Sequence, residues 1–385
     1  MDEREYWLGF SAFPGIGPLK FQKLITKFGS AKDAWTATAT DLSESGIGEV
    51  ITAKFDTFRN NFSVSSYAKR LQDSKVPFLI LTDNEYPDLL KQIKNPPFVL
   101  YAKGDIEGTL LGNENFLGPA IRLSSSENFV PSLRQNTSIA VVGTRRVTEY
   151  GREVTESLTR ELVFNNFTIV SGLALGVDAI AHKTAIENNG KTIAVLGCGV
   201  DCCSPRENSD LYNRILSSGG LVISELPLSH DPTRGSFPSR NRIIAGLSLG
   251  ILVTEGAEDS GSLITADYAL KFNRKLFAVP GPITSQLSKG PNSLIEKGAK
   301  LVSSLDAILT ELSVQQKGIK SIKSIRGESR EEQLILDILE NEPLHFDEIV
   351  RRSNFTSSNV GSVLSVLEIK GIIKSMDSGI FGIVY

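Results

Sequence analysis

The sequence lacks the features that mark membrane, secreted and disulfide-stabilised proteins. No apolar run reaches the 18 or so residues that a membrane span needs, and the acidic first residues do not resemble a signal peptide. Cys198, Cys202 and Cys203 are the only cysteines, and no histidine lies near them in sequence. Free thiols are therefore expected rather than a metal site. We expect a cytoplasmic protein that does not contact a membrane and holds no metal or other cofactor.

Signatures of several enzyme classes are also missing. The sequence has no Gly-x-x-x-x-Gly-Lys-Ser/Thr loop, no His-Glu-x-x-His motif and no Gly-x-Ser-x-Gly motif. Gly197-Cys-Gly199 resembles a dinucleotide fingerprint but lacks its third glycine, which removes most of the support for NAD binding. The net charge is −3, so binding to nucleic acid would require a local basic patch.

What the sequence does contain is a series of short apolar runs, each followed by a small, polar or charged loop. The runs are 138–142, 168–170, 192–196, 221–223 and 250–253. Helical segments are expected between or after them, near 149–164, 176–189, 206–218, 262–273 and 292–298. This alternation predicts an α/β fold with a parallel sheet, whose loops gather at one edge where ligands bind.

The loops at that edge are suited to phosphate. Gly143, Thr144 and Arg145 follow one strand, and Ser171 and Gly172 follow another. Glycines and hydroxyls at helix starts expose backbone amides to an anion, and arginine can grip phosphate with two bonds. The alternative for Arg145 is an ion pair with a glutamate of the next helix. Asp178 is expected to orient a neighbouring amide or arginine, and His182 to be a packed, neutral histidine.

Two further segments complete the candidate site. Phe237, Arg240, Asn241 and Arg242 combine a ring with cations, as proteins that hold unpaired bases do. The alternative is that the ring is core and the arginines cover a helix surface. Ser260, Gly261 and Ser262 form another anion nest at a helix start. The nearby carboxylates Glu255, Glu258 and Asp259 are expected to anchor the arginines of the preceding segment.

The flanking regions have a different character. Residues 1–65 read as a helical domain in which Gly-Ile-Gly occurs twice, at 15–17 and 46–48, as in helix-hairpin-helix or SAM-like units. The central domain spans 66–312, with two edge strands before a loop insertion at 105–137. A polar linker at 313–330 leads to 331–385, where three amphipathic helices and a terminal hairpin around 377–379 predict a winged helix.

Several of these motifs occur together, in order, in one known family. Val-Gly-Thr-Arg (142–145), Ser-Gly-Leu-Ala-Leu-Gly-Val-Asp (171–178), Phe-Pro-Ser-Arg-Asn-Arg (237–242) and Ser-Gly-Ser-Leu-Ile-Thr-Ala (260–266) resemble the DNA-processing protein A (DprA/Smf) family. The resemblance is dense over 138–302, and it implies an extended Rossmann-like fold. Arg206 joins the candidate site because the family has a cation after its proline. Ser204 departs from the family, which usually has an aromatic residue there.

The resemblance also implies a function. The family binds single-stranded DNA, protects incoming strands in natural transformation, loads the RecA recombinase and forms homodimers, without an established catalytic activity. An alternative from the residues is a nucleotide phosphoribohydrolase-like enzyme of the lysine-decarboxylase-like group, in which Glu255 or Glu258 would act on the ribose. A third possibility is a scaffold whose winged helix docks a protein. The phosphate-suited loops, Phe237 and the arginines favour the first of these, which is not an enzyme.

Overall fold

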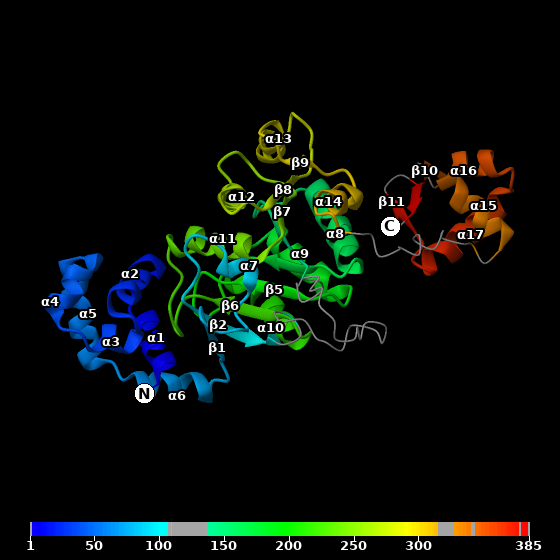
Figure 1. Ribbon diagram of the computed structural model, residues 1–385. Coiled ribbons are helices and arrows are strands. Elements are labelled where there is room, and N and C mark those ends of the chain that lie inside the picture. Colours follow the sequence, from blue (N-terminus) through cyan, green and yellow to red (C-terminus); the bar gives the residue numbers. More distant parts are fainter. Residues whose placement is uncertain are drawn as a thin grey trace, which may run out of the picture. The chain divides into compact units, whose positions relative to one another are not determined.

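The computed structural model describes residues 2–106, 109, 137–314, 327, 329–339, 343–376 and 379–383. The chain forms two compact units, Met1–Gln315 and Gln316–Tyr385 (Figure 1). Most of the predicted insertion at 105–137 and linker at 313–330 lies outside the described residues. Among the helices of the described ranges, none is long and apolar enough to cross a membrane.

A single sheet organises the first unit (Figure 1). In the described part of the chain it has nine strands in the order β1-β2-β6-β5-β4-β3-β7-β8-β9, with β3 to β9 parallel and β1 and β2 antiparallel at one edge. The strands are β1 (Phe78–Ile80), β2 (Val99–Gly104), β3 (Ser138–Val142), β4 (Thr168–Ser171), β5 (Thr192–Val195), β6 (Leu221–Ser224), β7 (Gly250–Val253), β8 (Lys275–Ala278) and β9 (Lys300–Leu301). The five strands predicted for the parallel part of the sheet are confirmed with their parallel pairing. β1 and β2 are the two predicted edge strands, and β8 and β9 extend the sheet.

Helices cover both faces of this sheet because its strands are apolar on both sides. Ile139 and Val141 of β3 pack in a core with α8 (Glu149–Phe164), α9 (Val177–Glu187) and α14 (Leu305–Glu311). Ala140 and Val142 point the opposite way, as alternate strand residues must, into a core shared with α7 (Asp88–Lys91), α11 (Ser236–Leu247), α12 (Gly261–Lys271) and α13 (Lys289–Glu296). Helix α10 (Ser209–Ser217) adds a smaller cluster. The predicted helices are present, but α11 was not expected.

The N-terminal helices are α1 (Glu3–Ala12), α2 (Pro18–Phe28), α3 (Ala31–Thr36), α4 (Ala39–Leu42), α5 (Glu49–Asn61) and α6 (Val64–Asp73). Two of them, α2 and α5, begin directly after the Gly-Ile-Gly motifs. Each motif ends on a helix N-cap, Gly17 for α2 and Gly48 for α5. Gly48 has a φ of 95°, a value that favours glycine. The repeated motif therefore marks two sharp entries into helices.

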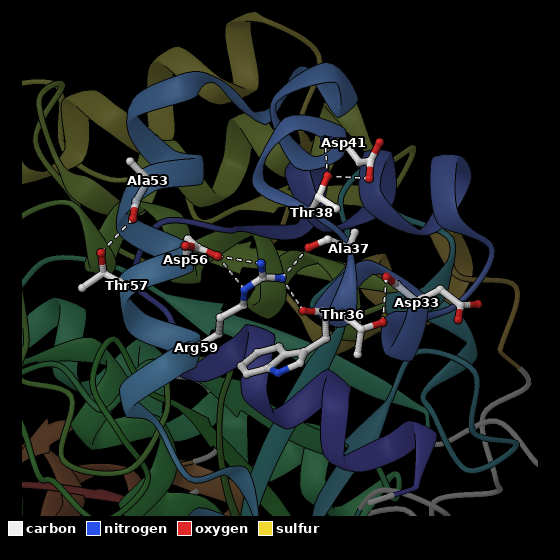
Figure 2. Close-up of polar contacts among 10 residues, drawn as sticks. Asp33, Thr36, Ala37, Thr38, Asp41, Ala53, Asp56, Thr57 and Arg59 are labelled. Carbon is white, nitrogen blue, oxygen red and sulfur yellow. Dashed lines mark hydrogen bonds and ion pairs between the residues drawn. The ribbon is translucent and has the colours of Figure 1, made fainter.

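Arg59 ties the end of α3 to α5 (Figure 2). Its guanidinium donates to the backbone carbonyls of Trp35 and Ala37, where α3 ends, and pairs with Asp56 one turn earlier on α5. The last carbonyls of a helix have no N–H partner within the helix, and at the end of α3 the Arg59 guanidinium supplies donors for them.

The N-terminal helices and the sheet share one core. The ring of Phe21 on α2 stacks on Phe98, just before β2, with centroids 4.1 Å apart. Tyr101 of β2 is fully buried in the same cluster. The expected domain boundary at residue 65 falls inside α6, which packs there through Tyr67 and Leu71. The helices therefore form part of the first compact unit.

The second unit has the winged-helix arrangement that the sequence predicts. Helices α15 (Arg330–Leu339), α16 (Phe346–Ser353) and α17 (Ser357–Ile369) surround their own core. Strands β10 (Leu344–His345), β11 (Ile373–Met376) and β12 (Ile380–Ile383) form a sheet in the order β10-β12-β11. Asp377 and Ser378, in the predicted turn, lie outside the described residues.

The shared core predicts that the first unit loses stability when Phe21 is truncated. Phe21→Ala should cost about 3–5 kcal/mol in the free energy of unfolding, since it leaves a cavity beside Phe98. Urea unfolding followed by tryptophan fluorescence measures this. Leu19→Ala on the same helix is the control, because Leu19 is 54% exposed; equal effects of the two substitutions would contradict the packing described here.

Candidate functional site

A cavity of about 660 Å³ opens at the carboxyl ends of β3 and β7. From β3 the chain adds β4, β5 and β6 on one side and then returns to add β7, β8 and β9 on the other. Loops on the two sides of such a reversal diverge and leave a crevice, which is where ligands bind in open α/β sheets. The predicted loops line this cavity, together with the first half of α11.

The loop after β3 is held against the loop after β7. The backbone N–H of Thr144 donates to the carbonyl of Glu255 at 2.7 Å, and a side chain at Gly143 would come within 2.6 Å of that same oxygen. This close approach explains the glycine. Thr144 itself is buried, whereas Arg145 and Arg146 are exposed and line the cavity. The loop therefore places two cations at the rim.

The N-terminus of α12 forms the opposite wall. Ser260 is the N-cap, and its hydroxyl accepts from the backbone N–H of Ser262. The amide of Asn241 donates to the carbonyl of Gly261 at 3.2 Å, which fixes α12 against α11. Ser260, Gly261 and Ser262 line the cavity where α12 begins, at the positive end of its helix dipole. The N–H of Ser262 is used by Ser260, so an anion nest at this point stays a prediction.

Phe237 and Arg145 lie together. The guanidinium of Arg145 sits over the half-buried Phe237 ring, 5.9 Å from its centroid. Both residues also border a smaller cavity of about 110 Å³, with Gly172, Ser204 and Pro205 among its lining residues. A serine at 204 offers no second ring at this point, so Phe237 supplies the aromatic face.

Arg240 was expected among the cations that hold a strand, but the structure buries it. Its side chain is only 6% exposed, and its guanidinium donates to the backbone carbonyls of Gly172 and Val195. Burial lowers the pKa of Arg240, and Asp178 opposes that shift. Arg240 lies in the floor of the cavity, tying the ends of β4 and β5 to α11. Gly172 is required there, because a side chain would come within 2.4 Å of the guanidinium.

Asp178 completes this floor as the sequence suggested. Its carboxylate accepts from the backbone N–H groups of Gly172 and Ala174. Burial raises the pKa of Asp178, while Arg240 and those amides act in the opposite direction.

Three other expected residues lie outside the main cavity. Arg242 is 3% exposed and pairs with Glu225, facing a different cavity. The hydroxyl of Ser171 donates to the carbonyl of Val141 inside the sheet. Arg206 is exposed but lines neither cavity near Phe237, although Pro205 beside it does.

Glu255 does not anchor the arginines, contrary to expectation. It is 2% exposed, and its carboxylate accepts from both the backbone N–H and the hydroxyl of Thr148, the N-cap of α8. A carboxylate at a helix start is favourable because the unpaired N–H groups there are partly positive. Glu258 is exposed and does not line the cavity, while Asp259 does.

Sequence reasoning missed two cations at the cavity. Arg146 stands in the recognised loop and Arg234 precedes α11; both are exposed and line the cavity. Within the described ranges, no carboxylate forms an ion pair with Arg145, Arg146 or Arg234. Two signals in the sequence could have found them. Arg146 directly follows the suspected Arg145, and Arg234 lies three residues before Phe237.

Comparison with known proteins identifies the family. Residues 130–313 match the family profile described as DNA recombination-mediator protein A, and residues 323–379 match the DprA winged helix domain. The chain is 39% identical over 311 residues to Protein Smf of Synechocystis, covering 80% of this chain and 73% of that protein. The chain belongs to the DNA-processing protein A (DprA/Smf) family.

Solved structures of this family have the same fold. The DprA structure from Streptococcus pneumoniae superposes with a TM-score of 0.65 at 33% identity, covering 81% of this chain and 98% of that one. The Helicobacter pylori protein, whose structure is described as showing a single-stranded DNA binding mode, gives 0.50 at 30% identity and covers 62% of this chain and 96% of that one.

The buried histidine beneath the site makes stability depend on pH. Burial, with a contribution from Arg240, lowers the pKa of His182 to about 3, and its Nδ1 bonds the hydroxyl of Thr192. Its pKa in an unfolded chain is near 6.5. Below that pH the unfolded state binds the extra proton, so this group removes stability as pH falls from about 6.5 toward 3, by about 1.4 kcal/mol per pH unit.

His182→Gln should therefore flatten the pH dependence of the unfolding free energy between pH 7 and 5.5. Urea unfolding of both proteins at these two pH values measures the difference in slope. The comparison does not depend on any overall loss of stability in the variant. Parallel pH profiles would show that His182 accepts a proton in the folded protein.

Proposed function

We propose that the main cavity binds single-stranded DNA. The observation that carries this proposal is the rim formed by Arg145, Arg146 and Arg234, which are exposed and have no carboxylate partner in the described part of the chain. Unpaired arginines beside a cavity attract anions, and a guanidinium matches phosphate with two bonds. The similarity to the H. pylori protein supports the same ligand.

The Phe237 ring favours an unpaired strand over a duplex. Proteins that hold single strands stack bases on aromatic faces while cations track the backbone. Phe237 provides the aromatic face, and Arg145, which lies over that ring, provides the cation. The N-terminus of α12 borders the cavity, and the positive end of its helix dipole favours a further phosphate there. Stacking bases of any identity makes the binding tolerant of sequence.

Membership of the family supports a proposal for the role in the cell. We propose that the chain protects incoming strands in the cytoplasm and passes them to a RecA-type recombinase, acting as a homodimer, with neither cofactor nor catalysis. The names of its relatives, DNA processing protein and Protein Smf, and the recombination-mediator family support this role.

In the described part of the chain, the geometry of the two candidate glutamates does not favour the alternative of a nucleotide phosphoribohydrolase. Both carboxylate oxygens of Glu255 are occupied by Thr148, and its side chain is buried. A carboxylate held in this way cannot approach a ribose. Glu258 does not face the cavity.

Removing the rim cations should weaken binding through phosphate contacts. We expect a lower affinity for oligothymidine in each of three variants, Arg145→Ala, Arg146→Ala and Arg234→Ala. In each, the slope of log K against log salt concentration should become shallower by about one, because one phosphate contact is lost. Phe237→Ala should cost about 1–3 kcal/mol by loss of stacking, with the salt slope retained. Fluorescence anisotropy at several salt concentrations separates the two effects.

Lys183→Ala is the matched control, because Lys183 is an exposed cation on α9 that does not line the cavity. Its affinity should equal that of the unaltered protein. Unchanged affinity in all three arginine variants would exclude the cavity as the DNA site.

The winged helix should be dispensable for this binding. The sheet unit Met1–Gln315 has its own cores, and the cavity is built within it. A chain ending at residue 315 is expected to bind oligothymidine within about twofold of the full chain, as measured by the same anisotropy assay. Loss of most of the affinity on truncation would assign the DNA contact to the second unit.

A further inference from the structure

An exposed apolar turn lies in the chain between β8 and α13. Ile283 in this turn is 88% exposed, more than any other large hydrophobic residue of the described ranges. The turn is held in place, because the N–H of Ser285 donates to the Pro282 carbonyl and the side-chain amide of Asn292 bonds both backbone groups of Gly281. A single exposed isoleucine is common in proteins, so its surroundings decide whether it marks a binding surface.

The ring of Tyr150 packs at the base of this turn. Tyr150 lies in the first turn of α8 and is 41% exposed. Its hydroxyl donates to the carbonyl of Pro280 at 2.6 Å, and its Cε1 is 3.7 Å from where a Cβ would stand at Gly281. The hydrogen bond fixes the polar end of the ring while much of the residue stays in water. Such a ring can receive a planar group without first being ordered.

A lysine lies beside the same glycine. The chain folds back so closely that a side chain at Gly281 would collide with the Ser288 hydroxyl. Lys289 follows directly as the first residue of α13; it is exposed, and no carboxylate pairs with it in the described part of the chain. The carboxylate of Glu149, on the neighbouring helix start, pairs with Arg152 at 3.8 Å. Lys289 is therefore open to an anionic ligand.

These three residues, Tyr150, Ile283 and Lys289, form a loop patch that adjoins the main cavity. None of the three lines the cavity, but both segments that carry them continue into its wall. Leu287, two residues before Lys289, is part of the lining, and so is Arg146, four residues before Tyr150. A ligand that leaves the cavity beside Arg146 would meet the patch next.

We propose that the loop patch is a further contact zone for an unpaired DNA strand, which leaves the main cavity past Arg146 and continues over Tyr150 to Lys289. This inference rests on the proposed function of the cavity. An aromatic face, an aliphatic side chain and a cation are the combination that holds stacked bases and their backbone in sites that tolerate any sequence. A protein partner would account for Ile283 alone. The fixed ring beside an unpaired lysine favours a ligand that carries both planar groups and negative charge.

The patch would make binding depend on strand length. A strand already held in the cavity reaches the patch without a second diffusional encounter, so the added contacts strengthen binding only if the strand spans both zones. A short strand would occupy the cavity alone.

The test compares a six-nucleotide and a twenty-nucleotide oligothymidine on the full chain by fluorescence anisotropy. Three variants alter the patch: Tyr150→Leu removes the aromatic face, Ile283→Ser the apolar tip and Lys289→Ala the cation. Tyr150→Phe is the matched control for the ring. Lys297→Ala is the control for the cation, because Lys297 is exposed at the other end of α13 and does not line the cavity. Melting temperatures confirm that each variant folds.

With the twenty-nucleotide probe, we expect Tyr150→Leu to weaken binding by about fivefold or more, through loss of stacking. Ile283→Ser should weaken it in the same direction, and Lys289→Ala should make the slope of log K against log salt concentration shallower by about one. Both controls should bind this probe like the unaltered protein. The six-nucleotide probe should not distinguish any of these five variants from the unaltered protein.

The proposal is overturned if folded Tyr150→Leu and Lys289→Ala proteins bind the longer probe like the unaltered protein while Arg145→Ala weakens both probes. It is also overturned if Ile283→Ser lowers the molar mass of the protein in light scattering and leaves the affinity for DNA unchanged, since the patch would then be a protein interface. Failure of the proposed function has a different signature, because neither probe would then respond to Arg145→Ala.

Discussion

The buried guanidinium of Arg240 holds the candidate site together. It joins α11 to the carbonyls of Gly172 and Val195, and Asp178 supplies a nearby negative charge while it binds the Gly172 and Ala174 amides. An arginine this deeply buried is tolerated only where carbonyls and a carboxylate surround it. Because Asp178 is engaged in the floor with the Gly172 and Ala174 amides and lies near Arg240, it does not pair with the rim arginines.

Helix α11 separates two cavities because of the spacing of its arginines. Arg240 and Arg242 are two residues apart, which places them about 200° apart around a helix. Arg240 accordingly faces the main cavity, and Arg242 faces the second one with Glu225. The intervening Asn241 bonds α12. One polar turn of helix therefore braces the strand ends, fixes the anion nest and forms part of a second wall.

Much of this architecture could be predicted from sequence, and the exceptions have physical causes. Strands such as 138–142 were found because a strand buried on both faces is a continuous apolar run. Helix α11 was missed because Arg240 and Arg242 in its first half are buried, so the segment has no apolar stripe to mark its buried side. The sequence does not show whether an arginine is solvated or bonded to carbonyls. Glu255 was misassigned because its partner, Thr148, is 107 positions away in the chain.

The distribution of charge explains how a chain of net charge −3 could still favour a polynucleotide. The net negative charge of the chain would repel a strand at long range. Attraction must therefore come from a local group of cations, whose effect is short-ranged at physiological salt. The rim arginines meet this need because they lie together and unpaired in the described part of the chain, whereas Arg4, Arg59 and Arg242 are paired with carboxylates. Asn241, whose amide is suited to reading base edges, donates instead to Gly261. Under the proposed function, the cavity would therefore recognise the backbone and the stacked face of a base rather than a particular sequence.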